Sequence, residues 1–206
     1  MLDTIAGQLT GYNPDSMNAS DVSAFLARMV TPVSDAQTVD IHDSLGRVLA
    51  ADISSPVSVP PHDNSAMDGY AFAGGELKPG QPLELKVVGT ALAGKAWRGE
   101  VNPGECVKVM TGAVMPAGLD TVAPQELVAV GDTAGCHVIT VPAGVLQPGD
   151  NRRLCGEDIQ QGQTALQSGE RLTPAALGLI ASLGIQAVPV WRKLRVAYFS
   201  TGDEIL

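Results

Sequence analysis

Apolar side chains recur at helical spacing near the start of the chain. Intervals of three and four residues predict an amphipathic helix over residues 20–30, with an apolar face of Val22, Phe25, Leu26, Met29 and Val30. We expect Ser20 to cap its first amides and Pro32 to mark its end. A further helical turn is predicted over residues 44–50, where leucine and valine side chains share a face.

A third helix is predicted after residue 172. Thr173 is expected to cap it, Pro174 to take its first position, and Gly184 to end it in the left-handed conformation. Its buried stripe is expected to consist of Leu177, Ile180 and Leu183.

The middle of the chain has brief β-branched runs separated by Gly, Pro and Asn, which is typical of a compact β-rich domain. The predicted strands cover residues 83–88, 106–110, 121–123, 127–130 and 137–141. Pro79-Gly80 and Pro103-Gly104 are expected to form turns, because Pro fixes φ and Gly takes the position with positive φ.

These patterns predict a mixed α/β fold in which one domain is inserted into another. Residues 20–55 and 150–192 are expected to form a composite α/β domain, and residues 56–149 the inserted β-rich domain. Residues 1–19 show little periodicity and are expected to form a flexible arm.

The last apolar run, residues 194–199, is predicted to be the first strand of a doubly wound α/β domain. Such a strand needs neighbours to pair its edges and cover its faces. We therefore expect residues 193–206 to be the start of a truncated third domain.

Composition excludes several classes of protein. The 206 residues carry 13 Lys and Arg against 22 Asp and Glu, a net charge of −9, which argues against nucleic-acid binding through bulk charge. No apolar run reaches the ~18 residues of a membrane span, and no basic residue precedes Arg28 as a secretory signal requires. Three cysteines without a CxxC spacing indicate a reducing, cytoplasmic setting.

The densest polar segment is residues 60–70, where two prolines precede a run of oxygen-bearing side chains. Its carboxylates, Asp63 and Asp68, lie five positions apart. A carboxylate in a rigid loop can hold Mg²⁺, which takes oxygen ligands and shares its waters with phosphates. The alternative is a local Asx turn, for which the same residue types are typical.

Two other segments offer groups for anions. Thr111 and Gly112 end a predicted strand with a hydroxyl and a backbone that a ligand can approach, which suits an oxyanion. Arg152 and Arg153 precede the acidic pair Glu157-Asp158. Either an anion site or a structural ion pair would use these charges.

Taken together, the chain resembles the molybdopterin molybdenumtransferase family, known as MoeA in bacteria and as the E domain of gephyrin in animals. The resemblance rests on five motifs in order, at residues 63–70, 110–113, 151–159, 180–185 and 199–204. It implies an elongated homodimer whose composite first domain carries an inserted second domain. A nucleotide-type α/β third domain and a β-barrel fourth domain then follow in the family.

The resemblance also implies a reaction: Mg²⁺-dependent insertion of molybdate into adenylylated molybdopterin, with release of AMP. It further implies contact with the molybdopterin adenylyltransferase that makes this substrate. By position, the family's catalytic residues correspond to Asp63, Thr111 and Glu204. Those expected to bind substrate are Asn64, Ser65, Arg153 and Asp158, and those expected to hold Mg²⁺ are Asp63, Asp203 and Glu204.

A second hypothesis is that the chain is a non-enzymatic dimerisation and partner-docking module, a role that gephyrin-like relatives also perform. Both hypotheses predict a homodimer, because the helices at residues 20–30 and 173–183 carry apolar stripes that one small domain would leave partly uncovered.

Overall fold

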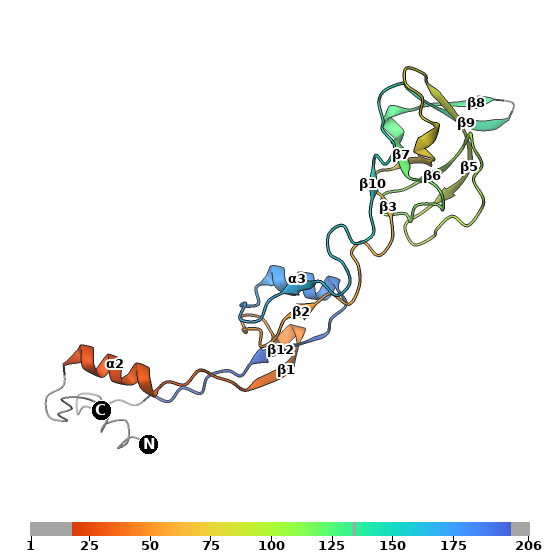
Figure 1. Cartoon of the computed structure of the whole chain (residues 1–206). Helices are drawn as coiled ribbons and strands as arrows, with labels where there is room; N and C mark the ends of the chain where they lie inside the picture. The colour runs from red at the N-terminus through yellow and green to blue at the C-terminus, as the bar shows by residue number, and fades with distance from the viewer. Residues whose placement is uncertain (1–17, 134, 199–206) are drawn as a thin grey trace, which may run out of the picture. The chain divides into compact units, whose positions relative to one another are not determined.

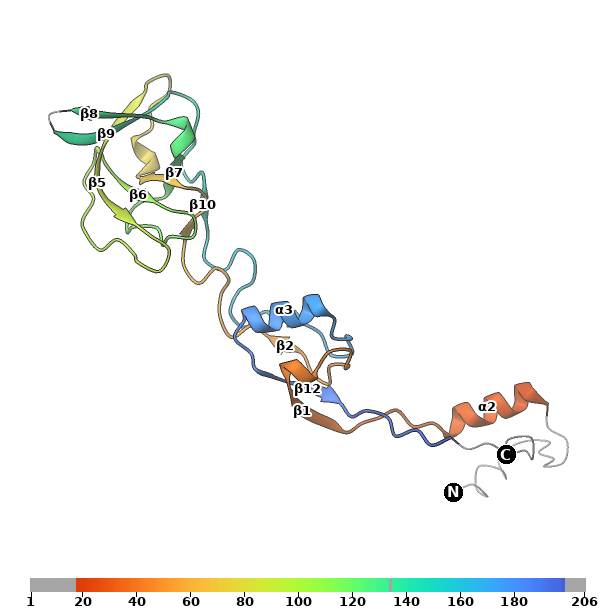
Figure 2. The same cartoon turned by 180° about the vertical axis from the view of Figure 1, so that it is seen from behind.

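The computed structural model describes residues 18–133 and 135–198. Within them the chain forms two compact units (Figure 1 and Figure 2). The first takes the residues up to Ala51 and from Gln167 onward, and the second is Asp52–Leu166. The folding pattern is mixed, with several small sheets and few helices.

The first predicted helix is confirmed as α2, Ala19–Met29, but its predicted cap is wrong. The N-cap is Asn18, whose side chain accepts a hydrogen bond from the Asp21 amide at 3.1 Å. The Ser20 hydroxyl donates to the same Asn18 oxygen at 2.6 Å. The side chain of Asn18, one residue before the helix, therefore caps it in place of Ser20.

The apolar face of α2 is exposed at each position that the structure describes. Val22 is 38% exposed and Leu26 54%, while the side chains of Phe25 and Met29 lie outside the description. Residues 1–17 of the expected arm also lie outside it.

The core of the first unit forms between helix α3, Pro174–Ser182, and an antiparallel pair of strands, β1 (Ala36–Asp40) and β12 (Ala187–Trp191). The predicted ends of α3 are confirmed. Thr173 accepts a hydrogen bond from the Ala176 amide, Pro174 opens the helix, and Gly184 follows it with a φ of 74°. The apolar side chains of this unit that are fully or nearly fully buried are Leu49, Leu172, Ile180, Leu183, Val188 and Val190.

The helical turn predicted over residues 44–50 is wrong. The 3₁₀ helix η1 covers Ile41–Asp43, and Gly46 then takes a φ of 74° that reverses the chain. The following backbone bonds across to another segment: Leu172 N–H donates to the Arg47 carbonyl at 2.8 Å, and Leu49 N–H donates to the Glu170 carbonyl at 2.9 Å. Pairing with a distant segment therefore replaces local helical bonds.

The second unit is built on a six-stranded sheet in the order β7-β4-β6-β5-β9-β8, in which β5 and β6 are parallel and the other neighbours antiparallel. The strands are β4 Gly69–Phe72, β5 Leu83–Ala91, β6 Glu105–Val109, β7 Thr121–Pro124, β8 Ala129–Thr133 and β9 Cys136–Val141. The five predicted strands are thus confirmed, with starts that differ by at most two residues. The strand predicted from residue 127 begins at Ala129, because Gln125–Leu127 forms a 3₁₀ turn, η3; another, η2, covers Gly74–Glu76.

Successive residues of the sheet contribute to different apolar clusters, so both of its faces are covered. Ala71 and Val107 belong to one cluster, and Phe72 and Cys106 to the other. Burial raises the pKa of the Cys106 thiol to about 12. That thiol is therefore a packing group that stays protonated at neutral pH.

Two short ladders extend the second unit beyond the boundary that the sequence analysis expects. Strand β2, Ile53–Ser54, pairs with β11, Thr164–Leu166, and β3, Asn64–Ser65, pairs with β10, Arg152–Arg153. Because these partners precede and follow the sheet in sequence, residues 150–166 fall in the second unit and not in the first.

The strand expected over residues 194–199 is not formed by residues 194–198, and Phe199 lies outside the described part. Leu194 is 71% exposed and Val196 80%. The physical reason is that none of the described strands pairs with this run. Among the residues that the structure describes, no helix has both the length and the apolar character needed to cross a membrane.

Gly69 illustrates how tightly the sheet packs. A β-carbon there would overlap the carbonyl group of Ala123 on the neighbouring strand. We expect Gly69→Ala to lower the free energy of unfolding by about 3 kcal/mol, the upper end for overpacking, because the obstacle is backbone. Gly75→Ala is the control, since its β-carbon would meet nothing within 4 Å. Urea unfolding measures both, and equal stability of the two variants would contradict the packing.

Candidate functional site

Strand β3 lies between two segments that are distant in sequence. On one side it pairs with β10, and on the other Asn64 bridges to Val114. Ser65 N–H donates to the Ala113 carbonyl, and Gly112 N–H donates back to the Ser65 carbonyl, both at 2.9 Å. Three of the predicted motifs, at residues 63–70, 110–113 and 151–159, therefore meet around this strand.

Asp63 precedes β3 and turns its carboxylate toward the segment that follows β10. Its Oδ1 accepts the Cys155 N–H at 2.8 Å, and its Oδ2 lies 3.5 Å from Nη1 of Arg152. The side chain is 39% exposed, so it is oriented by the protein and still open to solvent. Sequence reasoning missed Arg152 as its partner, because nothing in the local pattern says which of two adjacent arginines reaches it.

Arg153 forms a separate ion-pair cluster. Its Nε lies 2.5 Å from Oε1 of Glu157, and its Nη2 lies 2.6 Å from Oδ1 of Asp158. The pKa of Glu157 is lowered, first by the hydrogen bond from Arg153 and then by the one from the Leu154 amide. Arg153 therefore forms structural ion pairs, which is one of the two predicted alternatives for these charges.

Thr111 is held by Asp68. The Thr111 amide and hydroxyl both donate to Oδ1 of Asp68, each at 2.7 Å. The amide bond, the hydroxyl bond and the charge of Lys108 lower the pKa of Asp68 below its usual 3.8. Asp68 was not among the predicted site residues, although its place in the same motif as Asp63 was visible in the sequence.

Ser65 stabilises the loop in which it lies. It is 1% exposed, its hydroxyl donates to the Met67 carbonyl at 2.6 Å, and it accepts the Met67 amide at 3.3 Å. This is the local turn chemistry expected of a serine in such a segment. Asn64, beside it, is partly exposed and pairs with Arg153 across the ladder.

The other predicted metal residues, Asp203 and Glu204, lie outside the described residues. Within residues 18–133 and 135–198, no group of three or more His, Cys, Asp or Glu side chains gathers as a metal site would. Of the three residues predicted to hold Mg²⁺, Asp63 is therefore the one that lies in the described part of the chain.

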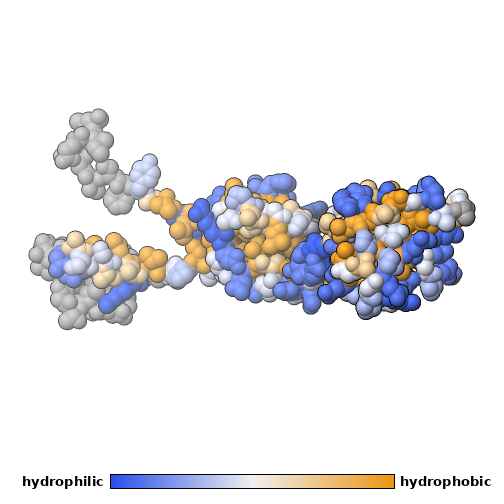
Figure 3. All heavy atoms as spheres, turned by 90° about the horizontal axis from the view of Figure 1, so that it is seen from above, coloured by the Kyte–Doolittle hydropathy of each residue, from blue (hydrophilic) through white to orange (hydrophobic). Residues whose placement is uncertain are grey.

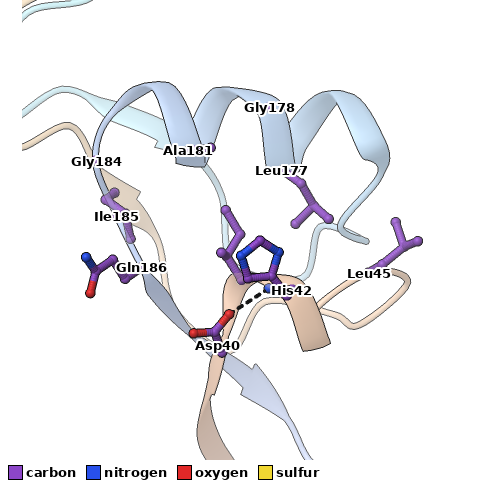
Figure 4. Close-up of a pocket in the computed structure, with 10 residues that line it drawn as sticks. Asp40, His42, Leu45, Leu177, Gly178, Ala181, Gly184, Ile185 and Gln186 are labelled. Carbon is purple, nitrogen blue, oxygen red and sulfur yellow. Dashed lines mark hydrogen bonds between the residues drawn. The ribbon is translucent and has the colours of Figure 1, made fainter.

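A pocket of about 740 Å³ lies in the first unit, between η1 and the end of α3 (Figure 4). The Asp40 carboxylate accepts the His42 amide at its edge, and Leu45 and Leu177 are among its apolar lining residues. It contains none of the predicted site residues. Figure 3 shows hydrophobic side chains at the surface of each unit taken by itself.

Comparison with known proteins identifies the family to which this fold and these motifs belong. Residues 17–184 match the family model described as MoeA N-terminal region (domain I and II). The molybdopterin molybdenumtransferase of Haemophilus influenzae is 39% identical over 84% of this chain and 41% of its own length. That of Synechococcus elongatus is also 39% identical, over 82% of this chain and 42% of its own.

A solved structure gives the same result. The crystal structure of the molybdopterin biosynthesis MoeA protein from Pyrococcus horikoshii OT3 superposes with a TM-score of 0.70 at 34% identity, covering 79% of this chain and 42% of that one. The chain thus belongs to the MoeA family. It spans less than half the length of the curated relatives named above.

The lowered carboxylate pKa values of the site predict how stability changes with pH. The pKa values of Asp68 and Glu157 are lowered in the folded state, so their stabilising effect is present above their unfolded values of 3.8 and 4.5 and is lost as the pH falls through the lower folded values. We expect these groups to leave the melting temperature flat from about pH 7 to 5 and to lower it below about pH 4.5.

Glu157→Gln should flatten that acid-side decline, because a glutamine does not titrate. Thermal unfolding at a series of pH values measures the effect. A variant whose melting temperature declines as steeply as that of the unmodified protein would show that this pair does not couple folding to protons.

Proposed function

We propose that the longer protein to which these residues belong acts in molybdenum cofactor biosynthesis as a molybdopterin molybdenumtransferase, which inserts molybdate into adenylylated molybdopterin with Mg²⁺ and releases AMP. The 206 residues alone are expected to be inactive. Relatives with that name share 39% identity with most of the chain. The observation that carries the proposal is the placement of Asp63, partly exposed and oriented at the junction of three family motifs.

The residues present fit Mg²⁺. This ion usually binds through one or two carboxylates and shares its remaining positions with water and phosphate. Asp63 offers such a carboxylate, and a role of Asp203 and Glu204 in binding Mg²⁺ stays a prediction from the family resemblance. When bound, the ion would neutralise charge on phosphate and molybdate oxygens.

The protein's own residues are proposed to orient the substrate. Arg152 balances the charge of Asp63 and is partly exposed, so it can also meet an anion. Arg153 has five N–H donors, of which those at Nε and Nη2 reach Glu157 and Asp158. We propose that Asn64, Arg153 and Asp158 contact the substrate from this ordered loop.

The alternative of a non-enzymatic docking module is less favoured, because the relatives carry a transferase name. A homodimer is expected under both hypotheses, whereas contact with the molybdopterin adenylyltransferase belongs to the transferase proposal. So does the organisation into a composite domain, an inserted domain and a third domain that begins near residue 193. Exposed apolar side chains on α2 support the homodimer.

Asp63→Asn tests the proposed reaction. The amide keeps an acceptor for the Cys155 N–H but removes the charge, so we expect Mg²⁺-dependent molybdate insertion to fall at least roughly a hundredfold with little change in melting temperature. Asp132→Asn is the control, since Asp132 pairs with His137 on an exposed hairpin. Turnover retained in Asp63→Asn would count against a role in the reaction, and a large loss of stability would favour the turn hypothesis.

Leu26→Asp tests the proposed homodimer. Leu26 is 54% exposed, so the substitution should leave folding intact while placing a charge on the apolar face of α2. We expect sedimentation velocity at tens of micromolar to show a dimer that this variant shifts toward monomer. Val130→Asp, at a 62% exposed position of the second unit, should remain dimeric. An unmodified protein that sediments as a monomer would refute the dimer.

A further inference from the structure

The loop after β6 presents Thr111 at the tip of a tight turn. Ala113 N–H donates to the Met110 carbonyl at 2.9 Å, and Gly112 has a φ of 79°, the arrangement of a type II turn. Thr111 is exposed there, whereas Ala113 is fully buried. The turn is therefore anchored on one side and open to a ligand at Thr111.

The backbone donors of this loop are used within the protein. Thr111 N–H donates to Asp68, Gly112 N–H donates to the Ser65 carbonyl, and Ala113 N–H donates to the Met110 carbonyl. An oxyanion cradle needs backbone amides that point at the anion. The interpretation of this loop as an oxyanion site, made from its sequence, therefore lacks the donors it requires.

The Thr111 hydroxyl proton is also committed. An ionised carboxylate can accept hydrogen bonds but cannot donate them. Because the pKa of Asp68 is lowered, this carboxylate is ionised at neutral pH, and the 2.7 Å contact requires Thr111 to be the donor. The Thr111 hydroxyl can then act toward a ligand only as a hydrogen-bond acceptor or a metal ligand, through the lone pairs of its oxygen.

Asp68 is well placed to fix this arrangement. Its carbonyl accepts the Gln125 N–H at 3.0 Å, and β4 begins at the next residue. A single oxygen, Oδ1, receives both donors of Thr111, so backbone and hydroxyl are held together.

We propose that Asp68 is a positioning residue that makes the Thr111 hydroxyl a hydrogen-bond acceptor, so that Thr111 receives a divalent cation or an N–H group of the ligand and not an oxyanion. The proposal rests on the proposed function for the identity of the ligand. The orientation of Thr111 by Asp68 stands independently of it.

The first experiment needs no ligand. Amide hydrogen exchange at Thr111, followed by NMR of the full chain, should speed up roughly tenfold or more in Asp68→Ala, which loses the hydrogen bond, and less in Asp68→Asn, which keeps a neutral acceptor. Glu105→Gln is the matched control: Glu105 likewise has a lowered pKa and accepts an amide and a side-chain donor, both from Asn102. Unchanged exchange at Thr111 in a folded Asp68 variant would overturn the positioning role.

The second experiment identifies the class of ligand. Magnesium chloride, free pterin and sodium molybdate are titrated separately while the Thr111 amide resonance is recorded. We expect Mg²⁺ or pterin to shift it and molybdate not to; which of the two acts distinguishes a cation from an N–H donor. Thr111→Ser should keep this response, Thr111→Val should lose it, and Asp68→Asn should weaken it roughly tenfold while Glu105→Gln does not.

A shift caused by molybdate, or no shift with any of the three, would overturn the acceptor role. Absence of molybdate insertion by the full-length parent protein would instead refute the proposed function. The exchange and titration results would remain valid in that case, so the two failures can be told apart.

Discussion

The antiparallel pairing of β3 with its two neighbours is the constraint on which the candidate site depends. This strand is two residues long, yet it joins residues 112–114 on one side to Arg152–Arg153 on the other. Each flank is far away in sequence, so no local propensity can hold them together. If the ladder opened, Asp63 would lose the Cys155 amide and Arg152 that orient it.

The electrostatics of the site follow from this geometry. The chain has a net charge of −9, and its carboxylates here are satisfied by its own donors: Asp63 by an amide and Arg152, Asp68 by Thr111, and Glu157 by Arg153. Oriented carboxylates of this kind are pre-organised, which reduces the entropy that a ligand must offset on binding. An acidic protein can thereby handle anionic substrates through a few local groups and a cation.

Much of the fold could be predicted from the sequence where the signal was local. Caps, proline positions and glycine turns defined α3 and the strands of the second unit, because these elements depend on neighbouring residues. The prediction failed at residues 44–50, where bonds to residues 170–172 override the apolar spacing. The pairing of residues 150–166 with β2 and β3 was likewise not visible, since register between distant segments leaves no periodic trace.

In the candidate site, too, local features could be predicted from the sequence and contacts between distant segments could not. The motifs containing Asp63, Thr111 and Arg153 were found from residue types and order, but their hydrogen-bond partners were not. Whether Arg152 or Arg153 faces Asp63 depends on the alternation of side chains across a two-residue ladder. That Asp68 accepts the hydrogen bond of the Thr111 hydroxyl depends on a contact between residues 43 positions apart.

Amide hydrogen exchange across the β3 ladder tests the central claim most directly. The relevant amides are those of Ser65, Gly112 and Met115, which bond to the Ala113, Ser65 and Asp63 carbonyls, and that of Cys155, which bonds to the Asp63 carboxylate. If one ladder assembles the site, the four amides should be protected together and should lose protection together when the second unit is destabilised. Exchange of these amides at the rate of an unstructured chain, while those of the six-stranded sheet stay protected, would contradict the account.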